Sequence, residues 1–221
     1  MSNDHEALVR DSNLELTALQ FRQSFERRQV QSGFNLGGGD HLLNPDYAVT
    51  DDETLKDASV LFGVIDREEG ASVLLTKRTE TLSSHKGQIA LPGGKIDPSD
   101  YSAESAALRE AHEEVGIEPE LVTVLGRLGE YKSGSGYRVI PVVGIINPAF
   151  VLRINEFEVA EAFEVPLGFL MNASNHEVGS AYWNEKERFF YKMPFGDGRD
   201  TKPIWGLTAG IIRMIYDRVY G

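Results

Sequence analysis

Hydrophobic and polar residues follow two different periods along this chain, and the two periods predict its secondary structure. Short apolar runs that are rich in β-forming residues and bounded by turn residues are typical of strands. Such runs occur at positions 58–65, 72–77, 121–128, 138–146, 180–183 and 188–192. The first two runs are separated by a short turn segment, as are the last two, so each pair predicts a β-hairpin. The run at 138–146 is nearly all apolar, which indicates a buried strand.

Helical spacing of apolar residues appears in two further segments. One helix is predicted over 102–115. A second helix, over 208–220, places Ile211, Ile215 and Val219 on one stripe. Strands that come first, a helix between strands and a helix at the end indicate an α/β fold with a mixed β-sheet and helices on both of its faces.

The first fifty residues differ from the rest. Ser12 and Glu15 have the spacing of a capping box, which predicts the start of a helix. The apolar residues that follow at helical spacing are Leu14, Ala18, Phe21 and Phe25. The segment 31–52 is rich in glycine and turn residues and predicts a flexible connector. We therefore expect an N-terminal helical arm and connector at 1–55, which adds little to the core of a main domain at 56–221.

Composition and charge exclude several classes of protein. The 221-residue chain has no run approaching the ~20 apolar residues of a membrane helix, and its acidic N-terminus lacks the pattern of a secretory signal. A cytoplasmic location is therefore expected, and a homodimer is left open. Because the chain has no cysteine, disulfides, thiolate metal sites and a cysteine nucleophile are excluded. The net charge of −12 opposes binding to nucleic acid, whereas a metal ion and local cations still permit a small phosphorylated substrate.

The segment 93–117 carries the candidate chemistry. Within its predicted helix, Glu110, Glu113 and Glu114 have the spacing i, i+3, i+4, which puts three carboxylates on one face. Three like charges destabilise a bare helix, and Arg109 together with hard divalent cations compensates them. The alternative is a solvated acidic face, the usual meaning of a charge run. A glycine turn, an Arg-Glu pair, paired glutamates and a terminal glycine in this order disfavour that alternative.

Glycines stand on both sides of this helix. Pro92-Gly93-Gly94 is expected to end a strand in a turn that has no side chain to block a ligand. We expect a carbonyl of this turn, with Gly94 as the candidate, to complete the shell of a bound metal ion. Gly116 suits the left-handed position at which a helix ends.

This order of residues resembles the Nudix box, the signature of the Nudix hydrolases. The positions that match the box, in order, are Gly94, Arg109, Glu110, Ala111, Glu113, Glu114, Gly116 and Ile117. Asp100 stands where the box has an early glutamate, and eight residues rather than seven separate it from Arg109. The resemblance implies an α/β/α sandwich, with Glu110, Glu113 and Glu114 as ligands of Mg²⁺ or Mn²⁺ and Arg109 as the residue that orients them.

The longer spacing is similar to that of one branch of the family, the coenzyme A pyrophosphatase-like proteins. A second signature of this branch is resembled by the segments 74–79 and 91–94 together with Gly87, with two mild departures, in which Thr79 replaces a serine or alanine and Leu91 replaces a phenylalanine. Ser83 replaces an arginine of that signature, and serine cannot make the two charge-assisted hydrogen bonds that an arginine makes to phosphate. Further similarity at 137–144, 155–159, 165–167 and 204–211 extends the resemblance over about residues 58–220.

Two loop carboxylates are candidates for the general base or for a further metal ligand. Glu156 and Glu158 follow the strand predicted at 138–146, in a loop from which Nudix enzymes often recruit such a residue. The alternative for each is a solvated loop glutamate.

Five residues are candidates for binding the substrate. Arg78, Lys77, Lys86 and Arg138 carry positive charge for a phosphate, and Arg78 is favoured because the branch signature includes it. Tyr137 is a candidate for stacking on a nucleobase, with packing as an equal alternative.

The expected function is hydrolysis of coenzyme A or acyl-CoA to 3′,5′-ADP and the corresponding 4′-phosphopantetheine. In this reaction, water attacks one phosphorus of the pyrophosphate, and a glutamate takes the proton of that water. The carboxylates bind the cations, and the cations neutralise the phosphate oxygens. One alternative, which Ser83 keeps open, is a Nudix hydrolase of ADP-ribose or another nucleoside diphosphate derivative. A second is a non-catalytic ligand-sensing Nudix module, which the three retained glutamates disfavour.

Overall fold

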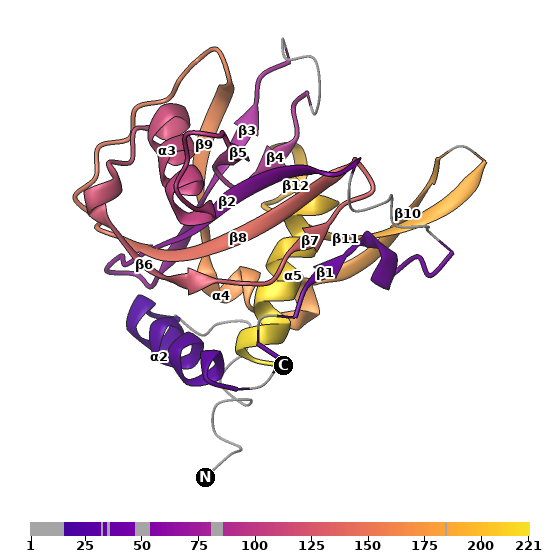
Figure 1. Ribbon diagram of the computed structural model, residues 1–221, viewed down its shortest axis with the longest axis horizontal. Coiled ribbons are helices and arrows are strands. Elements are labelled where there is room, and N and C mark those ends of the chain that lie inside the picture. The colour runs from indigo at the N-terminus through magenta and orange to yellow at the C-terminus, as the bar shows by residue number, and fades with distance from the viewer. Residues whose placement is uncertain (1–15, 32, 35, 47–53, 81–85, 184) are drawn as a thin grey trace.

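The computed structural model describes residues 16–31, 33–34, 36–46, 54–80, 86–183 and 185–221 (Figure 1). Its helices are α2 (Ala18–Gln29), α3 (Ala103–Val115), α4 (Leu167–Leu170) and α5 (Leu207–Val219). Its strands are β1 (Gly38–Gly39), β2 (Lys56–Ile65), β3 (Ser72–Arg78), β4 (Ile89–Ala90), β5 (Gly93–Lys95), β6 (Val122–Arg127), β7 (Tyr131–Lys132), β8 (Tyr137–Ile146), β9 (Val159–Pro166), β10 (Glu177–Trp183), β11 (Lys186–Phe195) and β12 (Lys202–Trp205).

The central sheet is mixed. Its strand order is β1-β7-β8-β2-β3-β4, with β5 paired to β2, β6 to β8 and β9 to β3. The strands β2 and β8 run parallel, in register from Lys56↔Tyr137 to Ile65↔Ile146. The predicted hairpin of β2 and β3 is antiparallel. The strand β9 was not predicted, because its sequence mixes glutamates with apolar residues in no regular alternation.

Side chains of the central strands are buried on both faces of the sheet, and this puts a helix on each side. In β2, Leu61 and Ile65 belong to a cluster under α3, whereas Phe62 and Val64 belong to a second cluster on the opposite face. The helical residues that meet them include Ala107, Ala111 and Val115 of α3 and Ile211, Ile212 and Ile215 of α5. Figure 1 shows α3 on one side of the sheet and α2 and α5 on the other. The predicted α/β sandwich is therefore confirmed.

The N-terminal helix is part of the core, which corrects one expectation. Phe21 and Phe25 of α2 are fully buried in the cluster on the α5 side, and the ring of Phe21 lies 5.9 Å from that of Phe62. The connector is not wholly free either, because β1 pairs in parallel with β7. The expectation of an arm that adds little to the core is thus wrong.

The start of α2 also differs from the prediction. The helix begins with a capping box formed by Thr17 and Gln20, whereas Ser12 and Glu15, the predicted pair, lie outside the described residues. A boundary between arm and domain near residue 55 stays a prediction.

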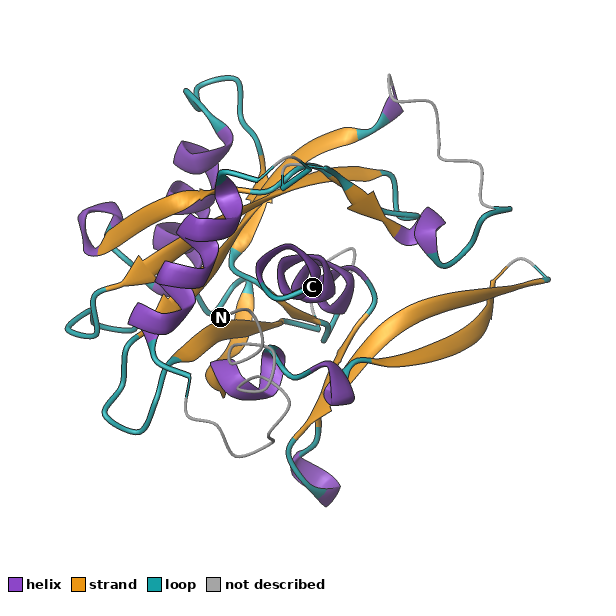
Figure 2. Ribbon diagram, turned by 90° about the horizontal axis from the view of Figure 1, so that it is seen from below, coloured by secondary structure: helices purple, strands orange, loops and turns teal. Residues whose placement is uncertain are grey.

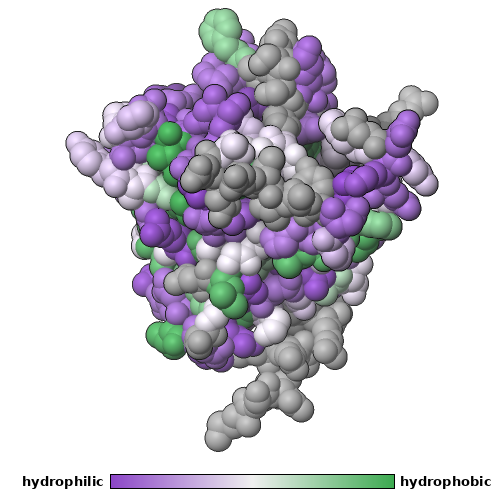
Figure 3. All heavy atoms as spheres, turned by 45° about the vertical axis from the view of Figure 1, so that its right-hand side comes forward, coloured by the Kyte–Doolittle hydropathy of each residue, from purple (hydrophilic) through white to green (hydrophobic). Residues whose placement is uncertain are grey.

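A separate three-stranded antiparallel sheet, β10-β11-β12, extends the predicted late hairpin. The outer end of the β10–β11 hairpin projects from the body of the molecule (Figure 2), whereas Met193 of β11 and Ile204 of β12 are buried in the cluster on the α5 side. On the face shown in Figure 3, hydrophilic residues predominate and apolar residues form small separate patches. Over the described ranges, no helix is long and apolar enough to cross a membrane.

Candidate functional site

The helix α3 presents the acidic residues, and its ends are as the sequence predicts. It starts at the N-cap Ser102, whose side chain accepts a hydrogen bond from the N–H of Ser105, while the side chain of Ser105 accepts one from the N–H of Ser102 in a capping box. It ends at Gly116, which adopts a left-handed conformation with φ +74°. Glycine takes this conformation without the steric cost that a Cβ atom imposes.

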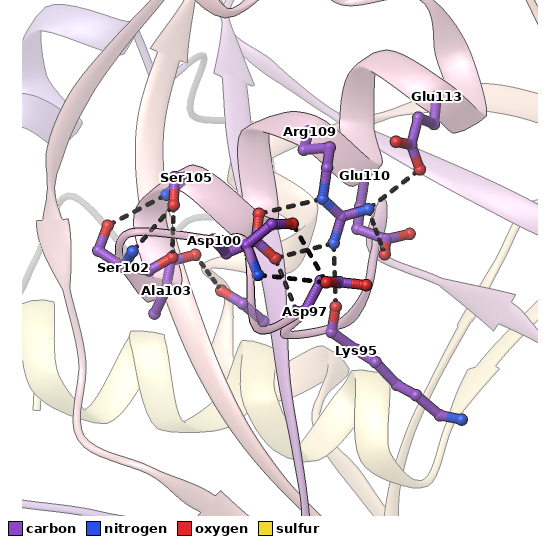
Figure 4. Close-up of polar contacts among 11 residues, drawn as sticks. Lys95, Asp97, Asp100, Ser102, Ala103, Ser105, Arg109, Glu110 and Glu113 are labelled. Atoms are coloured by element: carbon purple, nitrogen blue, oxygen red, sulfur yellow. Dashed lines mark hydrogen bonds and ion pairs between the residues drawn. The ribbon is translucent and has the colours of Figure 1, made fainter.

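Arg109 is the centre of a network of carboxylates (Figure 4). Its Nε and Nη2 each lie 3.0 Å from an oxygen of Asp100, and Nη2 also donates to the carbonyl of Lys95 at 3.1 Å. Its Nη1 donates to Glu110 at 2.9 Å and to Glu113 at 3.1 Å. The hydrogen bonds from Arg109 lower the pKa of Asp100, and those bonds in turn raise the pKa of Arg109. Arg109 therefore holds two of the three helix carboxylates in place.

Asp100 is a residue of the site to which the sequence analysis gave no role. It replaces the early glutamate of the box and has the shorter side chain, yet it binds Arg109 through both oxygens and its side chain is only 5% exposed. Its position in the Nudix box was the feature of the sequence from which its place in the site could have been predicted. Compared with the Nudix box, the loop before α3 is one residue longer, and the side chain at position 100 is one methylene shorter.

The third carboxylate, Glu114, is buried beside the glycine turn. Its Oε2 accepts a hydrogen bond from the N–H of Gly93 at 3.2 Å, and Nη1 of Arg78 lies 3.5 Å from its Oε1. Burial, with the nearby charges of Glu110 and Glu158, raises the pKa of Glu114 to about 7. Burial is also the main cause that raises the pKa of Glu110. In both carboxylates, burial outweighs the opposing effects of Arg109 on Glu110 and of Arg78 on Glu114.

Glu110 lies directly against Gly94. A Cβ atom at position 94 would be 2.4 Å from the carboxyl carbon of Glu110, a separation that forces one of the two groups to move. The sequence predicted Gly94 as part of a turn. The structure adds a second reason for glycine at this position, which is that it leaves room for the carboxylate of Glu110. The carbonyl of Gly94 as a metal ligand stays a prediction.

We expect Gly94→Ala to fold normally and to lose at least about 10-fold in hydrolytic turnover. The carboxylate at the end of the flexible Glu110 side chain can swing away at little cost to stability, but it then leaves its place beside Glu114, and a displacement of about 1 Å costs ~100-fold in some active sites. Steady-state kinetics and thermal unfolding would measure the two effects. Gly179→Ala, in β10, is a control with a similarly compatible backbone, and comparable losses in both variants would contradict this explanation.

Of the two candidate loop carboxylates, the structure brings Glu158 to the site. Its charge acts on both Glu110 and Glu114 and raises the pKa of each. Glu156 is exposed to solvent, and within the described part of the chain no interaction joins it to the helix carboxylates. The position of Glu158 favours it as the general base, a role that stays a prediction.

Among the candidate substrate-binding residues, Arg78 lies at the carboxylates. Besides its contact with Glu114, its Nε is buried and has no hydrogen-bond partner within the described residues. A buried donor without a partner is costly unless a ligand satisfies it. A role of Arg78 in binding a substrate phosphate stays a prediction.

The other four candidates lie in different surroundings. Lys77 is half-buried on β3, where its backbone lies opposite that of Glu161 in β9, and Lys86 is exposed in the turn before β4. Arg138 lies 2.6 Å from a carboxylate oxygen of Asp57. Tyr137 packs against the cluster on the α5 side of the sheet, opposite α3. A role in substrate binding stays a prediction for all four.

The residues fit a hard divalent cation by their chemistry. Glu110, Glu113 and Glu114 offer only carboxylate oxygens, which are the ligands that Mg²⁺ and Mn²⁺ prefer. The raised pKa values of Glu110 and Glu114 show that positive charge beside them would be stabilising. In the ranges that the structure describes, no three acidic or histidine side chains are grouped so that they could hold a metal ion, and Nη1 of Arg109 donates to both Glu110 and Glu113.

Comparison with known proteins is consistent with this site. Residues 55–187 match the sequence model of the NUDIX domain. Proteins named uncharacterized Nudix hydrolase NudL are similar. The one from Photorhabdus laumondii subsp. laumondii is 40% identical over 163 residues, which are 73% of this chain and 84% of that protein. The one from Yersinia pestis (strain Pestoides F) is 39% identical over 182 residues, which are 80% of this chain and 89% of that protein.

Solved structures are also similar. A MutT/nudix family protein from Enterococcus faecalis has a TM-score of 0.47 and 19% identity, over 92% of this chain and 74% of that one. The Nudix hydrolase RenU from M. smegmatis has a TM-score of 0.43 and 30% identity, over 50% of this chain and 70% of that one.

Proposed function

The chain belongs to the Nudix hydrolases, enzymes that cleave anhydride bonds of phosphorus-containing acids in small nucleotide-type substrates, and we propose that it hydrolyses coenzyme A or an acyl-CoA with Mg²⁺ or Mn²⁺. The observation that carries the metal dependence is the buried carboxylate of Glu114, which lies beside a second acidic side chain on α3 and a third from the loop before β9. The products would be 3′,5′-ADP and 4′-phosphopantetheine or its acyl derivative.

Each residue of the site has a distinct task in this reaction. Glu110, Glu113 and Glu114 would hold divalent cations, which neutralise the phosphate oxygens and acidify bound water. Arg109 keeps Glu110 and Glu113 in place through its hydrogen bonds. Glu158 takes the proton of the attacking water. Because positioning and charge stabilisation supply most of the acceleration in phosphoryl transfer, no covalent intermediate with the protein is needed.

Arg78 is proposed to bind the phosphate that is displaced or attacked. Its guanidinium contacts Glu114 on one side and offers its unpartnered Nε on another. A planar guanidinium can bind two phosphate oxygens at once, which fixes the substrate relative to the carboxylates.

The choice of coenzyme A as substrate rests on sequence similarity to one branch of the family. Three separate segments support it, whereas Ser83, which lies outside the described residues, stands against it. ADP-ribose or another nucleoside diphosphate derivative is the alternative. A non-catalytic sensing module is disfavoured, since all three helix glutamates are retained. The cytoplasmic location and the homodimer stay predictions.

We expect coenzyme A or an acyl-CoA to show the highest kcat/KM in a panel with ADP-ribose, NADH and nucleoside triphosphates, each assayed with Mg²⁺ and with Mn²⁺. Ser83→Arg should lower KM for coenzyme A and change kcat little, because an added phosphate contact binds substrate and transition state alike. A higher kcat/KM for ADP-ribose, with no effect of Ser83→Arg on coenzyme A, would contradict the choice of substrate. Metal-dependent pyrophosphate cleavage would then remain.

A further inference from the structure

The loop that follows β8 docks on the C-terminal end of α3. The N–H groups of Arg153 and Asn155 donate to the carbonyl oxygens of Val115 and Glu114 at 3.0 and 2.9 Å. The last carbonyls of a helix have no partner within it, so the loop supplies what they lack. A Cβ atom at Gly116 would be 2.8 Å from the Cβ of Arg153, so the glycine that ends the helix also makes room for the loop.

Asn155 closes the turn that carries Glu158. Its Oδ1 accepts a hydrogen bond from the N–H of Phe157 at 3.2 Å, and its carbonyl oxygen accepts from those of Glu158 and Val159 at 3.0 and 2.9 Å. Its side-chain Nδ2 donates to Oε1 of Glu158 at 3.4 Å. Asparagine side chains that bond the backbone two residues ahead are a common means of fixing a turn. The backbone of Glu158 itself is also fixed, because its carbonyl oxygen accepts a hydrogen bond from the N–H of Thr79 at 3.0 Å.

From these contacts we propose that Asn155 is a positioning residue for Glu158. Its backbone is anchored to the helix that carries Glu110 and Glu114, and its side-chain amide holds one oxygen of the Glu158 carboxylate. Asn155 therefore sets both the place and the orientation of that carboxylate relative to the pair on α3. This inference rests on the proposed function and deepens it, since it explains how a loop residue keeps a fixed relation to the helix residues.

Asn155→Asp isolates this contribution. Aspartate keeps the oxygen that accepts from Phe157, but it replaces the amide donor with a second carboxylate oxygen, which repels Glu158. We expect kcat for metal-dependent pyrophosphate hydrolysis to fall about 10–100-fold, a part of the ~10²–10⁴-fold that a well-positioned general base contributes, with KM unchanged within about twofold. The matched control is Asn147→Asp. Asn147 begins the same loop and accepts from the N–H of Ala149 at 2.9 Å, and its variant should keep the wild-type kcat.

A double-mutant cycle with Glu158→Gln separates positioning from a general loss of structure. If Asn155 acts through Glu158, Asn155→Asp has little further effect in the Glu158→Gln protein, and the two losses do not multiply. An unchanged kcat in Asn155→Asp, a fully active Glu158→Gln protein, or losses that multiply would each overturn the inference and leave metal-dependent hydrolysis intact. A wild-type protein with no metal-dependent turnover on any substrate of the panel would instead refute the proposed function, and with it a role of Asn155 in the reaction.

Discussion

Glu114→Gln is expected to lower turnover by at least about 100-fold at saturating metal and to leave the fold intact. The glutamine side chain has almost the same shape but cannot supply the negative charge with which a carboxylate holds a cation. Charge stabilisation by a bound metal contributes several kcal/mol in the transition state, and each ~1.4 kcal/mol changes the rate tenfold. Steady-state kinetics with Mg²⁺ and Mn²⁺, together with circular dichroism, would measure both expectations.

A control on the same helix makes this result specific. Glu104 also lies on α3, where it forms an ion pair with Arg127 at 3.7 Å and has a side chain that is 31% exposed. Glu104→Gln should therefore retain the wild-type rate. A Glu114→Gln protein that hydrolyses its substrate within about threefold of the wild-type rate would remove Glu114 from the metal site.

The same substitution should stabilise the metal-free protein above pH 7. The pKa of Glu114 is about 7 in the folded protein and 4.5 for an ordinary glutamate, so the folded state holds a proton that the unfolded chain has already lost between these pH values. The contribution of Glu114 to stability is therefore greatest below pH 4.5 and falls as the pH rises to about 7. Glutamine has no charge to bury. The Tm of the Glu114→Gln protein in EDTA at pH 8 should therefore exceed that of the wild-type protein by roughly a few °C. An equal or lower Tm would contradict this account of the buried charge.

Phe21→Ala is expected to destabilise the whole protein by ~3–5 kcal/mol, the usual cost of removing a fully buried phenylalanine. Phe21 is 0% exposed and lies among Phe25 and Phe62, with ring centroids 6.3 and 5.9 Å away. The cavity left behind lies between α2 and the central sheet, so the domain and the arm should unfold together. Chemical denaturation followed by circular dichroism and by tryptophan fluorescence would give the change in the free energy of unfolding.

Leu19→Ala is the matched control, since Leu19 lies on the same helix but is 61% exposed. Its free energy of unfolding should change by less than about 1 kcal/mol. Two separate unfolding transitions, or a Phe21→Ala protein as stable as Leu19→Ala, would show that α2 is an appendage as the sequence had suggested.

Short-range patterns determined α3, the helix that carries Glu110, Glu113 and Glu114. The prediction at 102–115 and the observed Ala103–Val115 agree because the apolar face and the terminal glycine both lie within one segment. The row of Glu110, Glu113 and Glu114 follows from helical periodicity alone. The strands β2, β3 and β8 were likewise predicted from runs of apolar residues, because strands buried on both faces need such runs.

Only the tertiary structure decided which distant residues join the helix carboxylates. Glu156 and Glu158 are both acidic and stand in one loop, and loop residues have no periodicity that would show which of them faces Glu114. The turn closed by Asn155, and its anchoring to the end of α3, make that choice. The sequence could not predict where α2 packs. An apolar stripe shows that one face of a helix is buried, but it does not identify the residues that bury it. Contacts between residues far apart in the chain depend on how the layers pack, and that information is absent from any single segment.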